Sequence, residues 1–324
     1  MRTIKIGLLG LGNIGTGTYK TLEMNRAEVE STLNAKVEIT KILERDIDRD
    51  RGITVDKNKF TSNPDEIFKD PEIDIVIELL GGIEPATTFM ISAMENGKHV
   101  VTANKAAVAA NYSKLMNTAK DNNVMMKFEA SVGGGIPILG TLTGPLRANK
   151  FEEVMGILNG TTNYILTMMT KEGLDYNTAL KDAQDQGFAE ADPTADVEGI
   201  DAANKLSILM ALMFDKYVAP EDIPTTGITE ITKEKIEEAR SNGCKIKLIA
   251  HAQRLEDGTI DYEVRPMYIS ATHPLANINK EFNAVFVKGN AVDDVMFYGK
   301  GAGPLPTGSA VMGDVIEISK SILK

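Results

Sequence analysis

The stretch TIKIGLLGLGNIG, residues 3–15, decides the fold of the first part of the chain. Residues 3–10 form a short apolar run typical of a buried strand, and a helix-compatible segment follows through Leu33. The turn between them carries Gly10, Gly12 and Gly15 in the spacing G-x-G-x-x-G. This spacing permits a tight turn, lets a pyrophosphate approach the backbone, and presents the N–H groups of a helix start to it. Glycines between a strand and a helix also serve as plain turn residues, so the motif needs its context.

The context is an alternation of strands and helices. The strand signal recurs in four further runs: 35–43, 74–79, 98–103 and 124–130. Helix-compatible segments lie between several of them, among them 84–97 and 104–123. Such alternation predicts right-handed crossovers and a parallel sheet that is covered on both faces. The sequence therefore predicts an α/β fold with a Rossmann-type, dinucleotide-binding first domain over residues 1–135.

Charged residues follow the second predicted strand, in ILERDIDRDRG (42–52). An acid there, such as Glu44, would hold the 2′-hydroxyl of NAD, whereas Arg45 would neutralise the 2′-phosphate of NADP. Lys57 and Lys59 lie beyond. We predict that NADP(H) is preferred and NAD(H) tolerated; the alternative is a set of surface charges near a strand end.

The pattern changes after residue 130. EASVGGGIPILGTL (129–142) places three consecutive glycines where a sixth strand and helix would otherwise begin. Helices are predicted at about 160–186 and 199–214, and later strands at 244–253 and 260–269. These elements predict a second, α+β domain for substrate binding and dimerisation over 136–300. A C-terminal segment, 301–324, contains a helix that could pack back on the first domain.

Composition excludes several classes of protein. The chain has 324 residues and a net charge of -11, which would repel a nucleic acid backbone. One cysteine, Cys244, allows no internal disulfide, and with three histidines it makes no typical zinc site. The most apolar run, 206–214, is too short for a membrane span, and we expect no signal peptide at the N-terminus. We expect a cytoplasmic protein, with Cys244 packed as a small hydrophobe in a strand.

Negative charge gathers in GFAEADPTADVEGIDAANKL, residues 187–206. Five carboxylates precede a single lysine, Lys205, at the start of an apolar helical segment. A solvated loop followed by an Asp–Lys helix pair would explain this charge pattern without any chemistry.

Long motifs in a fixed order resemble the homoserine dehydrogenase family over almost the whole chain. They are GLGNIG, ELLGG (78–82), VVTANK (100–105), EASVGGGIPIL (129–139), GILNGTTNYIL (156–166), GFAEADPTADVEGIDAANK (187–205) and GAGPLPTGSAVMGD (301–314). The resemblance implies reversible, NAD(P)H-dependent reduction of L-aspartate 4-semialdehyde to L-homoserine, in threonine, methionine and isoleucine biosynthesis. It also implies a homodimer. The family's common C-terminal ACT-type regulatory domain is expected to be missing, which puts threonine feedback through such a domain in doubt.

The resemblance assigns roles at the charged segment. Lys205 matches the proposed acid/base lysine, and Asp201 stands one helical turn before it. Glu190 would grip the substrate's α-ammonium, and Asp196 is a second carboxylate on the substrate side. The substrate carboxylate would be received by Gly160 and Thr161, and Lys105 would reach the substrate or the nicotinamide. By residue pattern alone, the stretch at Gly160 is also a helix start capped by a threonine.

The resemblance also assigns cofactor and cation contacts. The cofactor would be bound by Gly10, Gly12, Asn13, Ile14, Gly15, Arg45, Lys57, Gly81, Thr102, Ala103, Lys105 and Gly303. A monovalent cation, Na⁺ or K⁺, would be held by the Glu129 carboxylate and by backbone carbonyls near Val132, Gly134 and Ile136. Without the resemblance, the three glycines of this segment would predict a plain hinge.

A lysine among carboxylates should keep its ammonium form, because nearby negative charge opposes any fall in its pKa. Lys205 would then be a ready acid in reduction and a poor base in oxidation near neutral pH, so we expect oxidation to speed up towards alkaline pH. Two alternatives stay open from the fold alone: another two-domain NAD(P) oxidoreductase acting on a small amino-acid-like substrate, and a non-catalytic NADPH sensor. A sensor would need neither Lys205 nor Glu190.

Overall fold

The computed structural model describes residues 2–324, which divide into two compact units. The first unit contains the residues up to Gly135 together with Ala302–Lys324, and the second contains Ile136–Gly301. The chain therefore leaves the first unit once and returns to it for its last helix. Within residues 2–324, no helix is long and apolar enough to span a membrane.

The first unit is built on a parallel sheet of six strands in the order β3-β2-β1-β4-β5-β6. Its strands are β1 (Thr3–Leu9), β2 (Lys36–Leu43), β3 (Phe60–Thr61), β4 (Ile75–Glu78), β5 (His99–Thr102) and β6 (Met126–Lys127). The order reverses between β1 and β4, as in Rossmann folds. This sheet confirms the predicted α/β class. Two details of the prediction were wrong, because β3 was not foreseen and the strand expected over 124–130 contains only two residues.

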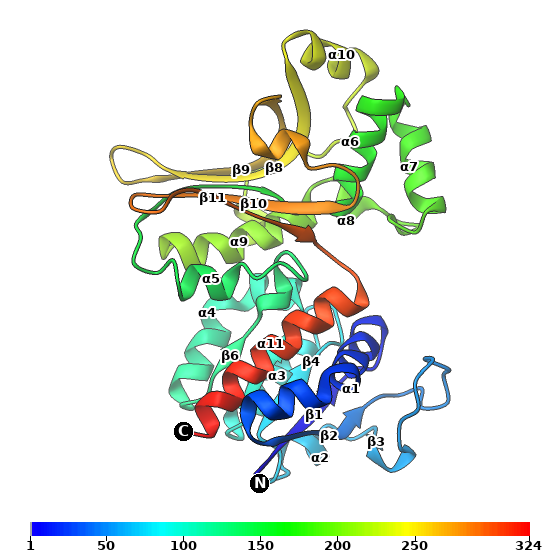
Figure 1. Cartoon of the computed structure of the whole chain (residues 1–324), viewed down its shortest axis with the longest axis vertical. Helices are drawn as coiled ribbons and strands as arrows, with labels where there is room; N and C mark the ends of the chain where they lie inside the picture. The colour runs from blue at the N-terminus through cyan, green and yellow to red at the C-terminus, as the bar shows by residue number, and fades with distance from the viewer. Residues whose placement is uncertain (1) are drawn as a thin grey trace. The chain divides into compact units, whose positions relative to one another are not determined.

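Helices cover this sheet. They are α1 (Asn13–Leu33), α2 (Asp65–Phe68), α3 (Ala86–Glu95), α4 (Lys105–Asp121) and α11 (Pro304–Ile322), with short 3₁₀ turns η1 (Lys57–Lys59) and η2 (Glu129–Ser131). Helices α1 and α11 lie side by side (Figure 1) and share one apolar core with β1 and β2. Right-handed crossovers place the helices that follow β4 and β5 on the opposite face, because the strand order runs the other way there.

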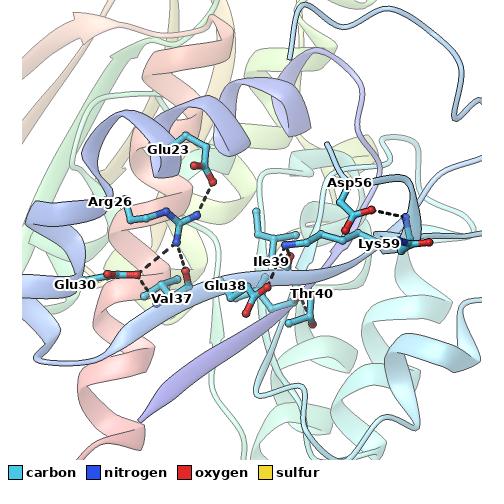
Figure 2. Close-up of polar contacts among 11 residues, drawn as sticks. Glu23, Arg26, Glu30, Val37, Glu38, Ile39, Thr40, Asp56 and Lys59 are labelled. Atoms are coloured by element: carbon cyan, nitrogen blue, oxygen red, sulfur yellow. Dashed lines mark hydrogen bonds and ion pairs between the residues drawn. The ribbon is translucent and has the colours of Figure 1, made fainter. Parts of the chain in front are cut away.

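Two basic side chains, one before β2 and one after it in the sequence, donate hydrogen bonds to the backbone of this strand (Figure 2). Arg26 on α1 donates to the Val37 carbonyl at 2.6 Å and to the Glu23 carboxylate at 2.5 Å. Lys59 of η1 donates to the Ile39 carbonyl at 2.8 Å and to Glu38 at 3.1 Å. The first half of the strand is thus held from the helix before it and from the loop after it.

The second unit contains an antiparallel sheet of five strands in the order β11-β10-β7-β8-β9. The strands are β7 (Phe151–Ile157), β8 (Cys244–Arg254), β9 (Ile260–Ser270), β10 (Phe282–Gly289) and β11 (Asp293–Lys300). One face of the sheet contacts helix α9 (Ile200–Phe214), and an apolar cluster joins the other to η4 (Pro274–Asn277). The predicted α+β class of this unit is confirmed.

The remaining elements of this unit are α5 (Leu139–Thr143), α6 (Gly160–Glu172), α7 (Tyr176–Asp185), α8 (Thr194–Val197), η3 (Pro220–Asp222) and α10 (Lys233–Ser241). The single helix expected over 160–186 was wrong. Gly173 takes a left-handed φ of 68° at the end of α6, and the Asp175 side chain caps α7 by accepting from the Thr178 N–H at 3.0 Å. A left-handed glycine followed by an Asp cap ends one helix and begins another.

Candidate active site

The glycine turn of the first unit is tight at Gly10 and Gly15 and open at Gly12. Gly10 has φ 92°, and a Cβ added to Gly15 would lie 2.2 Å from the Gly10 carbonyl oxygen. A Cβ added to Gly12 would meet nothing within 4 Å, so the turn is open there. Gly12 is the N-cap of α1 and makes no side-chain cap hydrogen bond, and no acidic residue lies in the first turn. The N-terminus of α1, with Asn13 and Ile14 as its first residues, is therefore suited to an anionic group.

Glu44 lies directly after β2 and is tied to the glycine turn. Its carboxylate accepts from the N–H groups of Leu11 at 3.1 Å, Arg45 at 2.8 Å and Asp46 at 3.2 Å. Burial works to raise the pKa of Glu44, but these hydrogen bonds and the charge of Arg51 hold it below its ordinary value. At neutral pH the group is an anion.

Arg51 was missed by the sequence analysis. Its side chain is 6% exposed, pairs with Glu44 at 3.2 Å, and donates to the Leu11 carbonyl at 2.8 Å. It lies in a run of acidic and basic residues that is typical of an exposed loop, and no motif spacing predicts a role for it. By contrast, the predicted residues Arg45 and Lys57 are exposed, and Lys57 pairs with Asp48 at 2.9 Å.

Other predicted cofactor residues lie where strands end or helices begin. Gly81 has φ 79° in the loop after β4, and Thr102 is the buried last residue of β5. Ala103 follows it, and Lys105 is the first residue of α4. Gly303 has φ 117° at the N-cap of α11. The carboxyl ends of parallel strands are where such sheets bind dinucleotides.

In the second unit, α9 carries a buried ion pair. Lys205 and Asp201 are the only charged residues of this helix, and they are 7% and 5% exposed. The Lys205 Nζ lies 2.7 Å from Asp201 Oδ2 and 2.5 Å from the Leu158 carbonyl oxygen. The Asp–Lys helix pair of the alternative interpretation is thus present, but it is buried. Burial of two charges is costly, so this pair in an apolar helix is a candidate functional site.

Asn159 organises the acidic groups and was also missed by the sequence analysis. Its carboxamide nitrogen donates to Asp201 Oδ2 at 2.9 Å and to Asp196 Oδ1 at 2.6 Å. Its carboxamide oxygen accepts from the Thr162 N–H at 2.8 Å and so caps α6. The expectation of a threonine cap for this helix was wrong. The signal that could have found Asn159 is its N-cap position before GTTN, because asparagine is a preferred cap.

The predicted substrate residues are only partly brought together. The Thr161 hydroxyl lies 2.6 Å from the Phe188 carbonyl oxygen and 3.1 Å from Asp196 Oδ2. Gly160 has a packing reason of its own, because an added Cβ would lie 2.7 Å from the Glu281 carbonyl oxygen. Glu190 is exposed in the loop between α7 and α8.

The predicted cation residues begin at η2. Glu129 is half-buried in this turn, Val132 is buried, and Gly134 has φ 56°. Asp314 of α11 accepts the Glu129 N–H at 2.8 Å, and burial, opposed by this bond, raises its pKa to about 7. Ile136 is the first residue of the second unit. A carboxylate followed by a glycine-rich backbone offers the oxygen ligands that hard cations prefer.

A parallel sheet with an open glycine turn, joined in one chain to a unit with a buried lysine–carboxylate pair, defines a nicotinamide-dependent dehydrogenase. Comparison with known families makes this specific. A sequence model of the homoserine dehydrogenase NAD-binding domain matches residues 10–129, and one of homoserine dehydrogenase matches residues 137–316. The chain belongs to the homoserine dehydrogenase family and is an oxidoreductase that acts on a CH–OH group.

Individual relatives agree with this assignment. Homoserine dehydrogenase of Bacillus subtilis is 44% identical over 323 residues, which is 99% of this chain and 74% of the relative. The crystal structure of a homoserine dehydrogenase from Thiobacillus denitrificans matches with a TM-score of 0.94 at 42% identity, over 99% of this chain and 74% of that chain. A hyperthermophilic archaeal homoserine dehydrogenase in complex with NADPH matches with a TM-score of 0.83 at 26% identity, over 98% of each chain.

Proposed function

We propose that the chain catalyses the reversible reduction of L-aspartate 4-semialdehyde to L-homoserine with NAD(P)H, in the biosynthesis of threonine, methionine and isoleucine. Family membership supports the reaction class, and the single observation that carries the mechanism is the buried pair of Lys205 and Asp201. Neither of the two alternatives left open by the fold accounts for this pair together with the family match. Both the sister oxidoreductase and the sensor are therefore less favoured.

Lys205 is the proton donor and acceptor in this proposal. A bound nicotinamide cofactor supplies the hydride in reduction and accepts it in oxidation. The Lys205 ammonium gives its proton to the substrate oxygen as the aldehyde carbon becomes a CH–OH group, and the neutral amine takes that proton back in oxidation. Asp201, at 2.7 Å, stabilises the ammonium. Reduction should therefore be active near neutral pH, whereas oxidation should accelerate as the pH becomes alkaline.

The remaining side chains hold the substrate. Gly160 and Thr161, at the N-terminus of α6, would receive its carboxylate, because a helix start favours an anion. Glu190 would bind the α-ammonium, with Asp196 on the same side. Lys105, at the start of α4, would contact the substrate or the nicotinamide. Glu190 is exposed in this structure, so it is available for a charged ligand.

NADP(H) is the proposed preferred cofactor, with NAD(H) also accepted. Three backbone N–H groups and Arg51 compensate the charge of Glu44, which reduces its repulsion of a 2′-phosphate. Arg45 is exposed at the same strand end and can pair with that phosphate. An archaeal homoserine dehydrogenase has been solved in complex with NADPH, which supports an NADP-type cofactor in this proposal.

A monovalent cation and a homodimer complete the proposal. Glu129 and the backbone at Val132, Gly134 and Ile136 would hold the cation. The second unit would form the dimer, since β9 and β11 end its sheet and expose Tyr268, Met296 and Tyr298. The mass in solution would then be twice the 35.1 kDa of the chain.

The deciding experiment follows NADPH oxidation with aspartate 4-semialdehyde. We expect turnover by the wild type and a loss of about a hundredfold or more in Lys205→Ala, the range of general acid–base catalysis. Lys181→Ala is the matched control, because Lys181 is an exposed lysine that pairs at i,i+4 with Asp185 at 2.5 Å. Circular dichroism checks that each variant is folded. A wild type that binds NADPH but turns over no semialdehyde would overturn the proposed substrate.

A further inference from the structure

A carboxylate is fully buried inside the parallel sheet. Glu78 is the last residue of β4 and is 0% exposed. It pairs in register with Thr102 on β5 and with Leu9 on β1, the residue before the glycine turn. The other three residues of β4 are Ile75, Val76 and Ile77. An apolar side chain would occupy this position at far lower cost than an acid, so the carboxylate requires an explanation.

Its hydrogen bonds join two loops. One oxygen of Glu78 accepts from the Leu80 N–H at 2.7 Å, in the loop that follows β4. The other accepts from the Thr102 hydroxyl at 2.7 Å, at the end of β5. Burial raises the pKa of Glu78, and hydrogen bonds from these groups oppose that rise. One oxygen thus holds the backbone of the loop after β4, and the other holds the Thr102 side chain at the end of β5.

Asn104 closes a second link between the same loops. Its N–H donates to the Thr102 hydroxyl oxygen at 2.9 Å, and its carboxamide nitrogen donates to the Gly82 carbonyl at 2.7 Å. Its carboxamide oxygen accepts from the Ala107 N–H at 3.1 Å and caps α4. The segments 79–82 and 102–105 are therefore connected twice, once through Glu78 and once through Asn104.

The network borders the glycine turn. The Leu79 N–H donates to the Leu9 carbonyl at 2.9 Å, and a Cβ added to Gly10 would lie 3.0 Å from the Leu79 carbonyl oxygen. In open parallel sheets, ligands bind beyond the carboxyl ends of the strands, where the strand order reverses. Here the order reverses between β1 and β4. The two connected loops are thus at the place where the nicotinamide dinucleotide of this family must bind.

We propose that Glu78 is a positioning residue for the cofactor: its buried carboxylate joins the 79–82 and 102–105 loops and presets them for the dinucleotide. Glu78 acts through Leu80 and Thr102 and has no contact with the reacting atoms in this proposal. The inference rests on the nicotinamide cofactor of the family and is independent of the roles proposed for Lys205 and the substrate residues.

The test measures the Kd of NADPH by fluorescence titration in Glu78→Gln. A carboxamide has one acceptor oxygen, so only one of the two donors, the Leu80 N–H and the Thr102 O–H, keeps an acceptor; the amide nitrogen can only donate to the Thr102 oxygen, which already accepts from the Asn104 N–H. We expect the Kd to rise about tenfold or more, with a much smaller change in the KM for homoserine. Glu84→Gln is the matched control, since Glu84 lies in the same connection but is exposed and accepts from the Thr88 hydroxyl at 2.8 Å. The Kd of NADPH for the Glu84→Gln protein should stay within about twofold of the wild-type value.

A double-mutant cycle separates positioning from general destabilisation. Thr102→Val removes the hydroxyl and should weaken NADPH binding, whereas Thr102→Ser keeps it and should bind nearly as the wild type does. If Glu78 and Thr102 act through their shared hydrogen bond, the effects of Glu78→Gln and Thr102→Val will be less than additive. An unchanged Kd in a folded Glu78→Gln protein, or fully additive effects, would refute the proposal. Should Glu78→Gln fail to fold, equal affinity in the Thr102→Val and Thr102→Ser proteins would refute it instead.

Discussion

A single carboxamide, that of Asn159, bridges two carboxylates, one of which pairs with Lys205. An asparagine side chain has two N–H donors and one acceptor oxygen, and Asn159 directs its nitrogen to both Asp196 and Asp201 while its oxygen caps α6. No other residue type of this size offers both functions. An aspartate would add a third negative charge, and an alanine would remove one hydrogen-bond donor from each of the two carboxylates.

Replacement of Asn159 should therefore reduce catalysis more than stability. In Asn159→Ala we expect kcat/KM for homoserine to fall about tenfold to a hundredfold, because each lost bond joins a neutral donor to a charged acceptor. The cap of α6 is lost as well, at a cost of about 1 kcal/mol. Asp175→Ala is the control, since it removes the equivalent cap of α7 with no contact to Asp196 or Asp201 in the described structure. Equal activity in the two variants would show that Asn159 is only a cap.

At the scale of elements, close packing of α1 against α11 holds the last helix in the first unit. A Cβ added to Gly17 of α1 would lie 2.2 Å from the Pro304 carbonyl oxygen. A Cβ added to Gly308 of α11 would lie 2.8 Å from the Gly17 carbonyl carbon. The two glycines face each other at the crossing, so the backbones approach closely. The helix that begins at the glycine turn is thereby packed against the C-terminal helix.

This crossing predicts opposite effects for two Gly→Ala changes. Gly17→Ala should lower the Tm by several degrees, because overpacking of a tight contact costs about 1–3 kcal/mol. Gly313→Ala, in α11 but with nothing within 4 Å of its added Cβ, should raise the Tm slightly, because alanine favours a helix by up to about 1 kcal/mol. Thermal melts of the two variants beside the wild type check the difference. Similar melts for both would contradict the packing argument.

At the scale of the whole molecule, the pH dependence of stability includes a buried cation. Lys247 on β8 is 2% exposed, and its ammonium donates to the Asn163 side chain at 2.9 Å and to the Ile278 carbonyl. Burial, with the positive charges of Lys245 and Lys171, lowers the pKa of Lys247 to about 7. Between this value and the 10.5 of an ordinary lysine, the unfolded chain binds a proton that the folded protein has released. The contribution of Lys247 to the free energy of unfolding therefore rises with pH between these two pKa values and is constant below them.

The wild type and its variants are compared by their difference in Tm, because the net charge of -11 destabilises all of them alike as the pH rises. The Tm of the wild type minus that of Lys247→Met should become more positive from pH 7 to about pH 9.5. Lys235→Met, at an exposed position, controls for the loss of one positive charge. Thermal melts in matched buffers give both differences. A difference for Lys247→Met that stays flat or falls would contradict the assigned direction.

Much of the fold and part of the site could be predicted because the signals are local in sequence. The residues of the glycine turn are close together in the sequence, and so are Asp201 and Lys205. Each strand or helix of the alternation is likewise predicted from a short run of consecutive residues. The break at Gly173 was missed because a glycine inside a helical pattern is often tolerated. Arg51 and Asn159 were missed for another reason. Their partners are Leu11 and Glu44 in one case and Asp196 and Asp201 in the other, and no local pattern announces such distant contacts.

The amino-acid sequence by itself determined the class of fold, the glycine turn and the family, because backbone preferences, hydrophobic period and ordered motifs act along the chain. Only the tertiary structure decided which charges are buried and what holds them. Lys205 and Asp201 become a dry ion pair because α9 packs against the second sheet, and Glu78 becomes a buried bridge because β1 and β5 flank it. The free energy of a charge depends on the solvent that its neighbours exclude, and those neighbours come together only on folding.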